Sequence, residues 1–134
     1  MDEPVLIDHL NARAPAFIKI LGGTIVAVDP EEPSCTFEFT IGTDFCHSID
    51  VVQGGFITAM LDAAMTHAVF SSIEGITGVS SLEIKTSYLE PTRAGRLRIL
   101  KSSYKIAFLE GQLYNEDGLL TATASSVAKL ARKA

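Results

Sequence analysis

One segment of the sequence, residues 54–73, is apolar on almost every side of a helix. Apolar side chains recur in it near the helical period, and small alanines fill much of the rest; the recurring positions are Phe56, Met60, Ala63, Ala64, His67 and Phe70. Glu74 and Gly75 provide a typical helix end. A helix that is apolar all round must be covered on more than one side. We therefore expect a sheet to wrap around it, or a second subunit to pack against it.

The segments on either side of this helix have the alternating pattern of antiparallel strands. Before the helix, residues 24–28 and 35–41 predict a hairpin around a loop that contains Pro30 and Pro33. After the helix, four more strands are predicted, at residues 79–89, 95–107, 109–114 and 119–130. Residues 115–118, Asn-Glu-Asp-Gly, form a strong hairpin turn between the last two strands.

A short amphipathic helix is predicted at residues 5–13, where Pro15 stops it, and residues 42–52 are expected to be an irregular loop. The order is therefore ββαββββ after a short N-terminal helix, which predicts an α+β fold. Within residues 79–89 the alternation places four side chains on one face of the strand, those of Leu82, Ile84, Thr86 and Tyr88. A length of 134 residues corresponds to a single domain, 1–134, with its core at about 20–130.

Composition excludes several classes of function. With 47% hydrophobic and 20% charged residues the chain is globular, and a net charge of −5 provides no basic field for nucleic acid. Cys35 and Cys46 are expected to be free thiols, and with three scattered histidines they offer no metal-ligand spacing. The N-terminus lacks the pattern of a signal peptide, and the longest apolar runs fall short of the ~18 residues that cross a bilayer. We expect a soluble, cytoplasmic protein without a membrane partner.

The start of the long helix carries the strongest indication of chemistry. Gln53 precedes Gly54 and Gly55, and Asp62 follows two turns later. Glycines let a ligand approach the unsatisfied N–H groups of a helix start, where the helix dipole adds partial positive charge. A carboxylate in an apolar run is costly to bury without a partner or a purpose. A helix end that polarises a carbonyl and a buried acid together point to acyl chemistry. The structural alternatives are a tight glycine turn and a carboxylate paired with a cation.

The element order, the length and the Gly-Gly-x6-Asp spacing resemble the hotdog-fold acyl-CoA thioesterases, in particular their phenylacetyl-CoA thioesterase-like branch. A second motif, Ser-Tyr-Leu-Glu-Pro at residues 87–91 followed by Gly95, carries the same resemblance. The family usually has His-Gly-Gly where this chain has Gln53 before its glycines. The resemblance implies hydrolysis of an acyl-CoA, with CoA as part of the substrate and no separate cofactor. It also implies a homo-oligomer, either a dimer or a dimer of dimers, with the site at the dimer interface.

This resemblance gives each residue of the helix start a role. Asp62 would act as general base on water or as nucleophile on the thioester carbonyl. The N–H of Gly54, beside Gly55, would donate to the thioester oxygen, and the donor and the acid would come from opposite subunits. Gln53 would orient the acyl carbonyl or the attacking water through its amide; capping of the helix start is the alternative.

Three further residues are candidates. Thr66, four residues after Asp62, corresponds to a hydroxyl that holds water in some thioesterases of this fold; a bond to the carbonyl of Asp62 is the alternative. Ser81 falls where the family has a hydroxyl in contact with the site, or it simply opens a strand. His47 takes the place of a family Asn and would position water or substrate from the loop.

A cluster of cations follows Pro91, at Arg93, Arg96, Arg98 and Lys101. The resemblance implies that it holds the phosphates of CoA, with solvated strand charges as the alternative. His67 follows Asp62 at a spacing similar to that of hotdog hydratases, but the two positions lie about 140° apart on a helix. A core or interface histidine is therefore the better interpretation, and a hydratase is disfavoured. The competing function is a non-catalytic acyl-CoA binder or sensor on the same fold.

Overall fold

The computed structural model describes residues 2–105 and 108–133 of the 134-residue chain. Two short helices, α1 (Glu3–Ala12) and α2 (Ala16–Ile20), precede the hairpin of β1 (Gly23–Asp29) and β2 (Ser34–Ile41). A 3-10 turn and the small hairpin of β3 (Cys46–Ser48) and β4 (Val51–Val52) lead into the long helix α3 (Gly54–Ser72). Four strands follow, namely β5 (Ile76–Tyr88), β6 (Gly95–Lys105), β7 (Phe108–Tyr114) and β8 (Leu120–Arg132).

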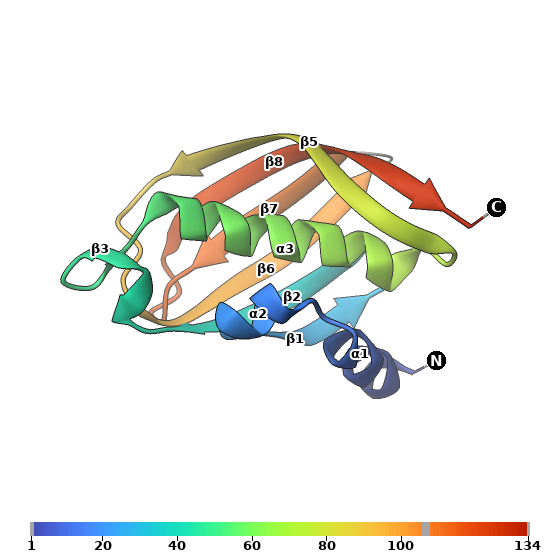
Figure 1. Ribbon diagram of the computed structural model, residues 1–134, viewed down its shortest axis with the longest axis horizontal. Helices are drawn as coiled ribbons and strands as arrows, with labels where there is room; N and C mark the ends of the chain where they lie inside the picture. The colour runs from blue at the N-terminus through green and yellow to red at the C-terminus, as the bar shows by residue number, and fades with distance from the viewer. Residues whose placement is uncertain (1, 106–107, 134) are drawn as a thin grey trace.

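A six-stranded antiparallel sheet in the order β1-β2-β6-β7-β8-β5 curves around α3 (Figure 1). The helix contacts all six strands of the sheet and buries most of its surface, including Met60, Leu61 and Met65. From the sheet, Phe37, Phe39 and Leu113 complete the same core without measurable exposure. The predicted α+β fold with a sheet wrapped around one central helix is confirmed, because one face of the sheet alone covers most of the helix.

Strand β5 lies at one edge of the sheet and contains a bulge. Ser81 pairs with Ala128 and Glu83 with Val127, so Leu82 is an extra residue without a partner on β8. Its side chain is 67% exposed, whereas Ile84 and Thr86 face α3 as predicted. The prediction that Leu82 shares their face is wrong, because a bulge shifts the inside–outside alternation by one residue. The shift turns Ser81 toward the helix.

Helix α1 covers the opposite edge of the sheet. The side-chain amide of Asn11 donates to the carbonyl of Ile25 at 3.0 Å and accepts from the Ile25 N–H at 2.9 Å, as a neighbouring strand would. The carboxylate of Glu3 accepts a further bond from the N–H of Val28 at 3.3 Å. Side chains of α1 thus pair backbone groups that an edge strand leaves open.

Two features differ from the sequence prediction. The residues before Gly22, for which no helix was predicted, form the short helix α2, which buries Ile18. Residues 42–52, predicted to be irregular, contain a 3-10 turn and the β3–β4 hairpin. Short elements of this kind carry too few residues for a periodic signal. The strand predicted at residues 95–107 corresponds to β6, and its predicted end at Ala107 lies outside the described residues.

Candidate active site

The first turn of α3 has one capped amide and one uncapped amide. Gln53 is the N-cap residue, and its Oε1 accepts a hydrogen bond from the Gly55 N–H at 2.7 Å. The Gln53 N–H donates to the carbonyl of Phe45 at 2.9 Å, which ties the helix start to the preceding turn. Among the described residues, none accepts a hydrogen bond from the N–H of Gly54. That amide is therefore the donor that the helix start presents to a ligand.

A cavity of about 570 Å³ opens at this helix start. Its lining includes four of the predicted site residues, His47, Gln53, Gly54 and Gly55. The rest of the wall comes from β4 and from the end of β5 with the loop after it, which contributes Tyr88 and Pro91. His47 hydrogen-bonds the neighbouring Ser48 through Nδ1 at 2.8 Å, and its side chain is exposed. The β3–β4 hairpin thus brings His47 to the same cavity as the glycines.

Asp62 lies apart from this cavity, on a half-buried stripe of α3. The Ser81 hydroxyl donates to its Oδ1 at 2.6 Å. A short bond to a charged oxygen is typical of a hydroxyl that stabilises a carboxylate. The structure therefore brings Ser81 and Asp62 together, and the bulge at Leu82 is what makes this possible.

Thr66 is on the same stripe, one turn beyond Asp62, and is also half-buried. Its hydroxyl donates to the carbonyl of Ala63 at 3.1 Å rather than to that of Asp62. Bonding back to the helix is the arrangement expected for a threonine without another partner.

One chain cannot bring the free amide and the acid to the same substrate atom. Gly54 and Asp62 are eight residues apart on one helix, which corresponds to about 12 Å along its axis at 1.5 Å per residue. A carbonyl oxygen and an attacking group must both lie within about 3 Å of one carbonyl. Each chain thus carries two separate half-sites, the cavity at Gly54 and the pair of Asp62 and Ser81.

Three hydroxyls that the sequence did not single out for function form a hydrogen-bonded chain that ends at Gly54. Tyr88 Oη donates to the carbonyl of Gly54 at 2.9 Å. Thr58 Oγ1 lies 2.9 Å from Tyr88 Oη and 2.9 Å from Thr86 Oγ1. The alternation placed Thr86 and Tyr88 on the same face of their strand. Only the register of β5 against α3 brings them to Thr58 and Gly54.

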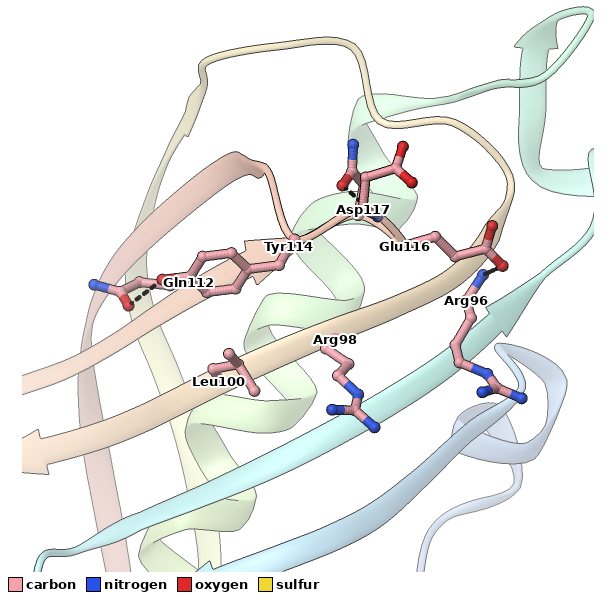
Figure 2. Close-up of a pocket in the computed structure, with 9 residues that line it drawn as sticks. Arg96, Arg98, Leu100, Gln112, Tyr114, Glu116 and Asp117 are labelled. Atoms are coloured by element: carbon pink, nitrogen blue, oxygen red, sulfur yellow. Dashed lines mark hydrogen bonds between the residues drawn. The ribbon is translucent and has the colours of Figure 1, made fainter.

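The cations after Pro91 are paired with carboxylates. Arg93 binds Asp50 at 2.6 Å, while Arg96 and Arg98 both contact Glu38, at 3.4 and 3.1 Å. Arg96 and Arg98 line a groove of about 860 Å³ on the face of the sheet away from α3, together with Glu116 and Asp117 (Figure 2). The pairing matches the alternative of solvated strand charges, and the CoA-phosphate role of Arg93 and Arg96 stays a prediction. The side chain of Lys101 lies outside the described part of the chain.

Two buried titratable side chains, those of His67 and Cys35, are part of the core. Burial lowers the pKa of His67, partly offset by a hydrogen bond at 2.7 Å to the carbonyl of Ala63, so the ring is a neutral donor packed edge-on against Phe37. This agrees with the prediction of a core histidine. Burial raises the pKa of the Cys35 thiol to about 12. Cys35 and Cys46 are both free thiols, as predicted.

Comparison with known proteins identifies the family. The family model of the Thioesterase superfamily matches residues 50–122, which include both half-sites. The chain belongs to the thioesterase superfamily. Membership supports thioester hydrolysis as the general reaction of this thioesterase.

Solved structures agree in fold. A phenylacetic acid degradation-related protein from Ralstonia eutropha is 31% identical, with a TM-score of 0.77 over 94% of this chain and 98% of that one. The PaaI protein of the E. coli phenylacetic acid degradation operon is 18% identical, with a TM-score of 0.79 over 93% of this chain and 91% of that one. A thioesterase from Haemophilus influenzae is 20% identical, with a TM-score of 0.76 over 94% and 90%. These matches place the thioesterase in the PaaI-like branch of the hotdog fold, as the resemblance implied.

A match to a curated protein is partial. An uncharacterized protein of Schizosaccharomyces pombe is 34% identical over 65 residues, which are 48% of this chain. The thioesterase covers only 37% of the length of that relative.

None of the described helices is long and apolar enough to cross a membrane. Within the described residues, no three His, Cys, Asp or Glu side chains come together as a metal site would require.

Proposed function

We propose that this thioesterase hydrolyses an acyl-CoA to the free acid and CoA at a site shared by two subunits. The observation that carries the proposal is the pair of half-sites on α3. One presents the unbonded Gly54 amide to a cavity, and the other holds Asp62 against Ser81. Because about 12 Å of helix separates them, a complete site needs the Gly54 of one chain and the Asp62 of another.

A symmetric dimer meets this requirement with simple geometry. If two copies of α3 run antiparallel, a two-fold axis near Thr58, midway between residues 54 and 62, sets each Gly54 against the partner's Asp62. The stripe of α3 that would face the partner is half-buried at Thr58, Asp62 and Thr66. Strand β5 offers a 13-residue edge that no other described strand pairs, and such an edge is a template for a second copy.

In the proposed reaction the thioester oxygen lies against the Gly54 N–H. Asp62 of the other chain takes a proton from water, and the resulting hydroxide attacks the carbonyl carbon. The Gly54 N–H stabilises the oxyanion that forms, an interaction stronger in the transition state than in the ground state. The oxyanion collapses, the C–S bond breaks, and the CoA thiolate leaves with the proton that Asp62 took from water, which regenerates the carboxylate. Direct attack by the carboxylate would give an acyl-enzyme anhydride that water then opens to the same products.

Other groups have supporting roles in this proposal. Ser81 holds the carboxylate in position through its 2.6 Å bond. His47 and the free amide nitrogen of Gln53 line the cavity where substrate or water is oriented. Thr66 provides a hydroxyl one turn from Asp62. Arg93 and Arg96 would contact the CoA phosphates by exchanging a carboxylate partner for a phosphate.

The test is hydrolysis of a panel of acyl-CoA substrates, followed by detection of the free thiol. We expect Asp62→Asn to lower kcat by about 10²–10⁴-fold, the range attributed to a general base, with the dimer and CoA affinity retained. Asp44→Asn is the matched control, because Asp44 is exposed in the 3-10 turn outside the site. Wild-type turnover by Asp62→Asn would contradict the assignment of the base. Tight acyl-CoA binding without thiol release would instead favour the non-catalytic binder.

A further inference from the structure

A chain of three hydroxyls joins β5 to the first turn of α3. It runs from Thr86 to Thr58 and on to Tyr88, and each Oγ1 or Oη lies 2.9 Å from the next. Tyr88 Oη completes the chain on the carbonyl of Gly54, also at 2.9 Å. Both threonines are half-buried, and Tyr88 belongs to the wall of the cavity at the helix start.

The direction of every bond in this chain follows from its end. A carbonyl oxygen only accepts, so Tyr88 gives its single hydroxyl proton to Gly54. Thr58 must then donate to Tyr88 Oη, and Thr86 must donate to Thr58 Oγ1. All three dipoles point toward the Gly54 carbonyl, an arrangement in which each bond polarises the next.

The acceptor of this chain belongs to a peptide that is held at both ends. The Gly54–Gly55 peptide has its oxygen on Tyr88 and its N–H on Gln53 Oε1 at 2.7 Å. The Gly54 N–H belongs to the adjoining Gln53–Gly54 peptide. The two peptides meet at the Cα of a glycine, whose wide conformational freedom would let them rotate relative to each other without such restraints. The ring of Tyr88 also favours glycine here, because a Cβ at position 54 would lie 3.1–3.3 Å from its hydroxyl and ring carbons and would have to displace them slightly.

We propose that Tyr88 is a positioning residue that aims the Gly54 N–H at the reacting oxygen, supported by Thr58 and then Thr86. The inference rests on the function proposed above. It predicts a graded series, because Tyr88 bonds the peptide itself, Thr58 acts one bond away and Thr86 two. Losing an oxyanion donor outright costs about 10²–10³-fold in kcat, and loosening one costs less.

The experiment compares steady-state kinetics of three variants that each lose one hydroxyl. We expect Tyr88→Phe to lower kcat roughly tenfold with KM within about twofold of wild type, because the loss is confined to the transition state. Thr58→Val should lower kcat less and Thr86→Val least. In ¹H–¹⁵N spectra, Tyr88→Phe should shift the Gly55 amide, whose peptide loses its carbonyl bond, and Thr86→Val should leave it nearly unchanged.

Ser71→Ala is the matched control. It removes a buried hydroxyl that donates to the carbonyl of Ala68 at 2.8 Å near the end of α3, at the opposite end of the helix from Gly54. We expect wild-type kcat. Wild-type kcat in Tyr88→Phe, or a loss of kcat that matches a loss of folded dimer, would overturn the positioning role. If Tyr88→Phe does not fold, equal kcat in Thr58→Val and wild type overturns it.

The function and the inference fail separately. Wild-type protein without thiol release, or Asp62→Asn with full turnover, removes the function. A wild-type enzyme that depends on Asp62 but tolerates Tyr88→Phe leaves the function standing and removes the inference alone.

Discussion

Residue 54 is the position at which a single atom decides the proposed chemistry, because only its N–H is free at the helix start. Gly54 is the first residue of α3, and proline is favoured there since its fixed φ suits the first turn. The preceding residue, Gln53, has φ −65° and ψ 137°, a conformation that proline permits in the residue before it. Gly54→Pro can therefore remove the N–H while the helix still begins at the same place.

We expect Gly54→Pro to lower kcat by about 10²–10³-fold, the cost of losing one oxyanion donor. Gly54→Ala is the matched control, because it crowds Tyr88 with a Cβ in the same way but keeps the N–H. The measurement is the ratio of the two kcat values, with helicity followed by circular dichroism. Equal kcat values for the two variants would mean that another group stabilises the oxyanion.

The parts of the candidate site that lie on a single secondary-structure element could be predicted from the sequence. Gly54 and Asp62 share a helix, so their chemistry and spacing could be read directly. The family resemblance placed Ser81 at the site without naming its partner. Its bond to Asp62 was not predicted, since it depends on a bulge. Tyr88 was not predicted to act at the helix start, because its bond to Gly54 joins residues 34 positions apart and is set by tertiary register.

At the scale of elements, the edge strand β5 has both a catalytic and an associative role in the proposed dimer. Alternation predicted a strand at residues 79–89, whereas β5 spans Ile76–Tyr88. It did not predict the bulge, which inserts one residue without any special residue type. The consequence is an exposed leucine: Leu82 lies on the open edge with 67% of its side chain accessible. Replacement of this exposed leucine is expected to change the folding stability of a single chain very little. It should matter only when another chain covers the side chain.

We expect Leu82→Lys to weaken the dimer at least tenfold while the unfolding temperature of each chain changes little, because a charge on an edge strand opposes pairing. Sedimentation across a concentration series measures the dissociation constant, and activity should fall with dimer content. Phe108→Lys is the control, since Phe108 is 61% exposed at the start of β7, away from that edge. An unchanged dimer in Leu82→Lys would exclude pairing through β5.

At the scale of the whole molecule, shared sites allow two inactive variants to restore each other. In a mixed dimer of Asp62→Asn and Gly54→Pro, one site receives both mutations and the other receives neither. Random mixing gives half mixed dimers, each with one of two sites intact, so we expect about a quarter of wild-type activity. The mixture is assayed by thiol release after subunit exchange. Activity no higher than that of the separate variants would show that each site is built within one chain.

The two edge strands of the sheet, β1 and β5, differ in whether their outward backbone groups have hydrogen-bond partners. Side chains of Asn11 and Glu3 bond backbone groups of β1, whereas the outer edge of β5, on the side away from β8, is paired by no strand that the structure describes. Strand addition at β5 can therefore join two copies. The continuous sheet of the resulting dimer ends at each side in β1, whose edge is covered by α1. Because the dimer has no open edge strand, further strand addition into fibres has no template. A long unpaired edge in the single chain is therefore tolerated.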